Sequence, residues 1–246
     1  MVEASGTIPG PPQTAAADRD DWVLIVVCVI AGALSVRFDT LGTPLAAGGA
    51  GLLGMFGLRL YDWSRLPAFT LTYAGEKERP PALVAFLWFG VGLLVGLLIL
   101  GFMRLVIEPS IPAMGQRIEA AGELSVGRRV VIIYVAAVTE ELIFRLVLLS
   151  GIVGVVIRAL RRTTLVPTQG IVWSANVACA VAFAGIHLPS WGAAGTDLWL
   201  AAWVLVLNFI AGLVMGYVFV TRGIAAAMWA HAGGDCAIQL VGPLSR

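Results

Sequence analysis

Long apolar runs constrain this sequence more than any other feature, because only short polar stretches separate them. The clearest run, from Ala82 to about Val106, consists mainly of Leu, Val, Gly and Phe. A helix needs about 20 such residues to cross a hydrocarbon core about 30 Å thick. Further runs approach or exceed this length at 22–38, 41–60, 130–157, 170–187, 198–220 and 224–241. We therefore expect an all-α, polytopic bundle of transmembrane helices with about seven spans, in the range six to eight.

The low content of charged residues supports a membrane location. They make up 13% of the chain, whereas soluble domains contain about a quarter. This chain has too little polar surface to face water on all sides, so we expect the lipid bilayer to solvate much of it. The net charge of +1 also lacks the excess of Lys and Arg that a nucleic-acid-binding surface requires. Nucleic acid is therefore not an expected partner.

The apolar runs also divide the chain into segments. Residues 1–21 are rich in Pro, Gly and Ala and contain acids, which predicts a disordered tail and not a signal peptide. Residues 22–129 are expected to form the N-terminal membrane helices and a connector with a short interfacial helix near 113–124. Residues 130–241 are expected to form a second group of membrane helices. Lys and Arg are more numerous on the side of the N-terminus, which favours a cytoplasmic N-terminus.

Three charged residues interrupt the middle of the fourth run, at Glu140, Glu141 and Arg145. Each central charge in a membrane helix costs on the order of 3 kcal/mol, so a simple anchor would not carry them. Glu141 and Arg145 are four residues apart, which favours an ion pair. Glu140 points about 100° away from Glu141, so it remains available for proton transfer. Alternatively, all three form one stabilising network, although buried ion pairs add little stability.

Both histidines of the chain, His187 and His231, also lie in apolar runs. His231 and Asp235 are four residues apart and share a helix face, either as two ligands of one ion or as a hydrogen-bonded pair. A lone histidine in a membrane is often only a contact between helices. The presence of these groups on three different runs predicts instead that they share a buried Glu/His/His/Asp site.

Three short patterns carry a family resemblance: Glu140-Glu141-x-x-x-Arg145, Phe183-x-x-x-His187 and His231-x-x-x-Asp235. Together they resemble the signature of the CPBP intramembrane proteases. That family includes CAAX prenyl endopeptidases of the Ras-converting type and bacterial relatives linked to bacteriocin immunity or abortive infection. The resemblance covers residues 130–241. It implies a multi-pass endopeptidase in a bacterial cell membrane, acting on a peptide or membrane-protein substrate.

The resemblance also implies roles for individual residues. Glu140 would activate a water molecule with help from His187, while Glu141 and Arg145 support the site. His231 and its partner would stabilise the oxyanion. Asp235 stands where some family members have Asn, and a carboxylate donates no hydrogen bond unless it is protonated. Asp235 therefore fits better as a metal ligand or as the orienting partner of His231.

Two mechanisms remain open for these residues. Zinc, or another divalent metal, would accept two nitrogens and two carboxylates from Glu140, His187, His231 and Asp235. In the metal-free alternative, Glu140 is the general base and the imidazoles carry protons or donate to the oxyanion.

Two other classes of function are also compatible with buried ionisable groups. An ion-coupled transporter uses such groups along its pathway, but many transporters show an internal repeat that is not visible here. A catalytically silent scaffold of the same fold would instead bind a membrane partner. The amide of Asn208, in the sixth run, is interpreted as a contact between helices.

Overall fold

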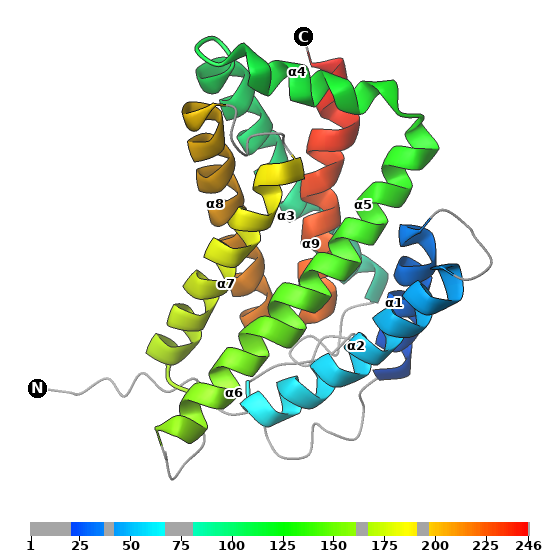
Figure 1. The fold of residues 1–246 in the computed structure, drawn as a ribbon, viewed down its shortest axis with the longest axis vertical. Helices are drawn as coiled ribbons and strands as arrows, with labels where there is room; N and C mark the ends of the chain where they lie inside the picture. Colours follow the sequence, from blue (N-terminus) through cyan, green and yellow to red (C-terminus); the bar gives the residue numbers. More distant parts are fainter. Residues whose placement is uncertain (1–20, 37–41, 67–80, 161–166, 191–196, 246) are drawn as a thin grey trace, which may run out of the picture.

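The computed structural model describes residues 21–36, 42–66, 81–160, 167–190 and 197–245, and the elements in these ranges are all helices. This confirms the predicted all-α class. Except for residue 21, which opens the first helix, the predicted N-terminal tail lies outside the described residues. The helices run roughly along one common direction and form a bundle, with one short helix lying across an end (Figure 1).

Four helical stretches are long and apolar enough to cross a membrane: Ala82–Ile107, Val126–Ala159, Gln169–Pro189 and Leu198–Arg222. The first comprises most of α3 (Pro81–Phe102) and η2 (Met103–Ile107), and the last is α8 (Leu198–Arg222). These stretches support an integral membrane protein.

The other three predicted spans are also helical. They are α1 (Asp21–Ser35), α2 (Gly42–Ser64) and α9 (Ile224–Cys236), which continues through η5 (Ala237–Val241) and η6 (Gly242–Leu244). Helix α1 has only 15 residues and ends before the predicted limit at residue 38. That these helices also cross the membrane, giving about seven spans, remains a prediction.

The longest helix carries the charged residues at its centre. It comprises α5 (Val126–Glu141), the π-helical segment η4 (Leu142–Leu149) and α6 (Ser150–Ala159). The α1–α2 pair packs along one side of it (Figure 1). One contact of this pair is the hydroxyl of Tyr134, which donates to the carbonyl of Val27 at 3.1 Å.

The helix that crosses one end of the bundle is α4 (Pro112–Ala120), followed by η3 (Ala121–Glu123). The sequence predicts a helix here, and Pro at the first helical position explains its start. Its apolar face is buried: Met114 and Ile118 belong to one apolar cluster with residues of η2 and α8. Helix α4 therefore covers one end of the space between α3, α8 and α9.

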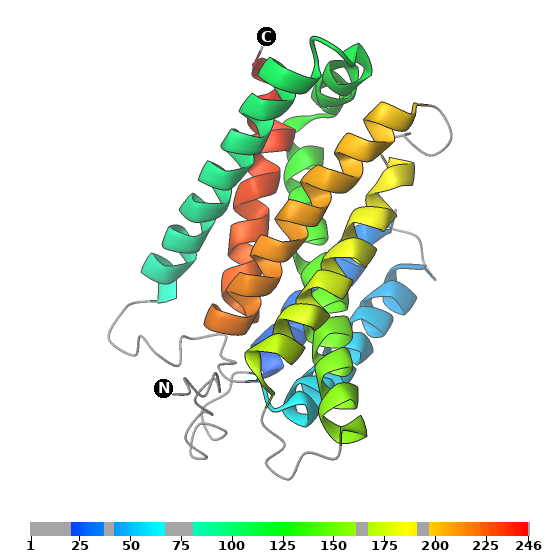
Figure 2. The ribbon, with the colours of Figure 1, turned by 90° about the vertical axis from the view of Figure 1, so that its left-hand side faces the viewer.

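Helices α3 and α9 lie in close contact, and Figure 2 shows them side by side. Glycines on both helices permit this approach. A Cβ atom on Gly92 would overlap the carbonyl of Ala230, and one on Gly233 would overlap the carbonyl of Phe89. Backbone therefore lies against backbone, which is typical of small-residue contacts between membrane helices.

A substitution on α3 tests this contact. Gly92→Ala should lower the free energy of unfolding by about 1–3 kcal/mol, because overpacking forces the backbone to move. Gly90→Ala is the matched control, since a Cβ there meets open space, and it should be neutral or slightly stabilising. Thermal unfolding of both variants in detergent measures the difference. Equal melting temperatures for the two would contradict the close packing.

Candidate active site

The acidic pair lies where the long helix changes from α-helix to π-helix. Glu140 and Glu141 end α5, and Arg145 follows within η4. The hydroxyl of Ser150 donates to the carbonyl of Arg145 at 3.2 Å, which satisfies one backbone group of the altered turn. π-Helical turns of this kind are frequent at functional sites.

Glu141 and Arg145 form the predicted ion pair and are almost completely buried. Arg145 Nε lies 3.2 Å from Glu141 Oε2, and the two side chains are 1% and 0% exposed. Arg145 Nη2 also donates to the carbonyl of Gly212 on α8 at 3.1 Å. The guanidinium lies over the ring of Phe183, 4.8 Å from its centroid, an arrangement that favours a cation. The pair thus joins η4, α7 and α8.

The same glutamate holds His231. Glu141 Oε1 lies 2.8 Å from His231 Nδ1, so the ring donates its Nδ1–H to the carboxylate. Asp235 Oδ2 is 3.8 Å from His231 Nε2, which is longer than a hydrogen bond. The sequence suggested Asp235 as the residue that orients His231. In the structure Glu141 makes the hydrogen bond to the ring, and Asp235 lies only at ion-pair distance.

His187 is anchored by a different acceptor. It lies near the end of α7 (Gln169–Ser190), and its Nδ1 is 2.7 Å from the carbonyl oxygen of Phe183 one turn earlier. A carbonyl only accepts, so the proton is on Nδ1. The Phe183 ring also packs against the imidazole, with centroids 4.5 Å apart. Phe183 therefore orients His187 and also packs against Arg145. The sequence pattern identified Phe183 as part of a motif but predicted neither contact.

Glu140 lies between the two imidazoles. Its Oε2 is 3.7 Å from His187 Nε2 and 3.7 Å from His231 Nε2. These distances are too long for direct hydrogen bonds. Within the described residues, this buried oxygen has no hydrogen-bond partner. The structure therefore brings the Glu140 carboxylate and both rings into one group.

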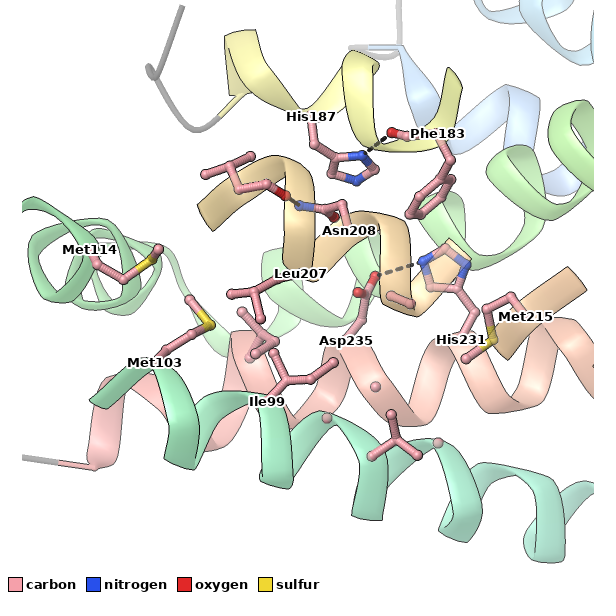
Figure 3. Close-up of a pocket in the computed structure, with 17 residues that line it drawn as sticks. Ile99, Met103, Met114, Phe183, His187, Leu207, Asn208, Met215, His231 and Asp235 are labelled. Atoms are coloured by element: carbon pink, nitrogen blue, oxygen red, sulfur yellow. Dashed lines mark hydrogen bonds and ion pairs between the residues drawn. The ribbon is translucent and has the colours of Figure 1, made fainter. Parts of the chain in front are cut away.

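A cavity adjoins this group. Its volume is about 110 Å³, enough for a few water molecules or one side chain. Its wall is mostly apolar and comes from α3, η2, α4, α7, α8, α9 and η5. The polar side chains in the wall are those of His187, Asn208, His231 and Asp235 (Figure 3). Asn208 was not among the predicted site residues, because a single amide in an apolar helix does not reveal which way it points.

The predicted metal ligands do not form a ready metal site. In the part of the chain that the structure describes, no three His, Cys, Asp or Glu side chains are arranged to hold a metal ion. A zinc site needs its nitrogen and oxygen ligands to converge at about 2.0–2.2 Å. That Glu140, His187, His231 and Asp235 bind a metal remains a prediction, and the mechanism below uses no metal.

Comparison with known proteins adds an independent finding. The model of the family described as Type II CAAX prenyl endopeptidase Rce1-like matches residues 123–237. Searches of curated proteins and of solved structures gave no match. The matched segment runs from η3 to η5 and contains every predicted site residue. Over this segment, which is just under half of the chain, the protein is similar to the Rce1-like family of type II CAAX prenyl endopeptidases, and the match confirms the resemblance to CPBP proteases.

Proposed function

We propose that this protein is an intramembrane endopeptidase in which Glu140 and His187 activate the water molecule that attacks a peptide bond. The observation that carries the proposal is the position of Glu140 Oε2, 3.7 Å from Nε2 of each of the two histidines whose side chains line the cavity. The substrate is a peptide or a membrane protein, and the family name suggests a prenylated CAAX sequence. The match to a peptidase family favours this function over an ion-coupled transporter.

Water activation follows from the hydrogen bonds of His187. Its Nδ1–H is donated to the Phe183 carbonyl, so Nε2 of the neutral ring accepts. One water molecule can lie about 2.8 Å from both Glu140 Oε2 and His187 Nε2, within hydrogen-bond distance of each. The water proton passes to Glu140, and the water oxygen forms a bond to the peptide carbonyl carbon. The carbonyl π electrons move to oxygen and give the oxyanion.

His231 and Asp235, both on α9, are proposed to stabilise the intermediate. His231, when doubly protonated, donates Nδ1–H to Glu141 and presents Nε2–H to the oxyanion. Asp235, at 3.8 Å, balances the charge of the ring. When the intermediate collapses, the carbonyl reforms and the C–N bond breaks. The leaving nitrogen takes the proton from Glu140, so the products are a carboxylic acid and an amine.

Glu141 and Arg145 act through other residues. Both are buried, and Glu141 meets His231 at Nδ1, not at the Nε2 that faces Glu140. Their contribution is to fix His231 and to join η4 to α8 through the Gly212 carbonyl. We therefore propose them as positioning residues for the reaction.

Removing the proposed base tests the function directly. Glu140→Gln keeps the shape of the side chain but removes the proton acceptor, so turnover should fall by a factor of about 10²–10⁴. The assay uses purified protein in proteoliposomes and an internally quenched, farnesylated peptide that ends in a CAAX sequence. Glu123→Gln, an exposed acid in η3, is the matched control and should retain turnover. Normal cleavage by Glu140→Gln would overturn the mechanism.

The ion pair makes a separate prediction about stability. Glu141→Gln should lower the free energy of unfolding by about 3–5 kcal/mol, because it leaves the Arg145 charge buried without its partner. The double variant Glu141→Gln with Arg145→Met should recover much of this loss, since it removes both charges. Turnover should remain low in both, because His231 loses the negative charge that supports its doubly protonated ring. Thermal unfolding and cleavage rates, measured on the same preparations, separate the two effects.

Metal removal distinguishes the two mechanisms left open by the sequence. The mechanism above predicts that exhaustive chelation leaves the cleavage rate unchanged. Metal content is measured in parallel by mass spectrometry, so that removal is verified. If chelation abolished cleavage and Zn²⁺ restored it, Glu140, His187, His231 and Asp235 would be reassigned as candidate ligands.

A further inference from the structure

The polar side chains that line the cavity mostly accept hydrogen bonds. The carboxylate of Asp235 accepts and, unless protonated, does not donate. The ring of His231 commits its Nδ1–H to Glu141, and the ring of His187 commits its Nδ1–H to the Phe183 carbonyl. Each neutral ring therefore offers only an acceptor at Nε2, and the doubly protonated His231 of the proposed mechanism adds a single donor, its Nε2–H. An oxyanion requires the opposite, namely donors aimed at the position where negative charge develops.

Asn208 is the lining side chain that donates in every protonation state. An amide carries two N–H groups and does not titrate. One N–H is donated to the carbonyl of Val204, one turn earlier on α8, at 2.8 Å, which leaves the second available. In Figure 3 the Asn208 side chain lies on the α8 wall between the His187 ring and the Asp235 carboxylate.

The hydrogen bond of Asn208 argues against a role in joining helices. Its partner Val204 belongs to the same helix, so this bond links α8 only to itself. Asn176 provides the contrast within this chain: its amide, on α7, donates to the carbonyl of Leu213 on α8 at 3.1 Å. Asn176 is 3% exposed and does not line the cavity. One asparagine thus joins two helices, whereas the other faces the proposed reaction space.

We propose that Asn208 is a further catalytic residue, whose free amide N–H donates a hydrogen bond to the oxyanion during peptide hydrolysis. This inference rests on the proposed function. Asn208 supplies from α8 the donor that an aspartate at position 235 does not supply from α9. The bonds formed and broken are those of the proposed mechanism. Water adds to the carbonyl carbon, its proton goes to Glu140, and the new oxyanion accepts a hydrogen bond from Asn208.

The inference is tested in the peptide assay with two asparagine variants. Asn208→Ala should lower kcat by roughly 10²–10³-fold, the usual loss for one oxyanion donor, with little change in KM or in the melting temperature. Asn176→Ala is the matched control. It should lower the melting temperature, because it removes a contact between helices, while folded protein keeps its kcat.

A rescue variant distinguishes a donor from a structural residue. Asp235→Asn, introduced into Asn208→Ala, places an amide on the opposite wall and should raise kcat at least about tenfold above the single variant. Failure of this rescue, or normal kcat in Asn208→Ala, would overturn the inference while leaving the proposed function intact. Wild-type protein and Glu140→Gln are measured in the same experiment. If wild-type protein leaves the peptide uncut, the proposed function fails and the role of Asn208 fails with it.

Discussion

The buried ion pair between Glu141 and Arg145 is the interaction on which the rest of the site depends. Charged groups near the middle of a helix in an apolar bundle are costly, and an ion pair offsets part of this cost. The pair does this at 3.2 Å. Hydrogen bonds from Arg145 to the Gly212 carbonyl and from His231 to Glu141 connect the pair to α8 and α9. The requirement to satisfy two charges therefore also fixes the relative positions of the helices that carry the reacting groups.

The helix that precedes the family match takes part in the same site. Helix α3 ends before residue 123, yet its glycines allow it to lie against α9 with almost no side chain between them. As a result, Gly92 and Gly96 form part of the cavity wall beside His231. The close approach keeps the reaction space narrow on this side, which explains why a helix without any charged or catalytic side chain still shapes the site.

The parts of this arrangement that follow a helical repeat were predictable from the sequence. The i, i+4 spacing of Glu141 and Arg145 predicts their ion pair, which the structure confirms, and long apolar runs predict the helices. Contacts between distant helices were not predictable in the same way. The hydrogen bond from His231 to Glu141 joins residues 90 positions apart, and only the packing of α9 against α5 creates it. The contact of Phe183 with Arg145 and the position of the Asn208 side chain in the cavity wall also depend on how the helices are rotated against one another. The sequence alone does not give this rotation.

The two imidazoles differ in their anchors, and this difference supports the different tasks proposed for them. His187 donates to a neutral backbone carbonyl, whereas His231 donates to a carboxylate that is itself paired with Arg145. A carboxylate anchor can support a ring that carries a proton on both nitrogens, because opposite charges then meet at hydrogen-bond distance. A carbonyl anchor offers no such charge. The acceptor at His187 Nε2 therefore suits water activation, and the donor form of His231 suits the oxyanion. Both Nε2 atoms lie 3.7 Å from one Glu140 oxygen, so the proposed base is equally near to the ring that would share the water and to the ring that would bind the oxyanion.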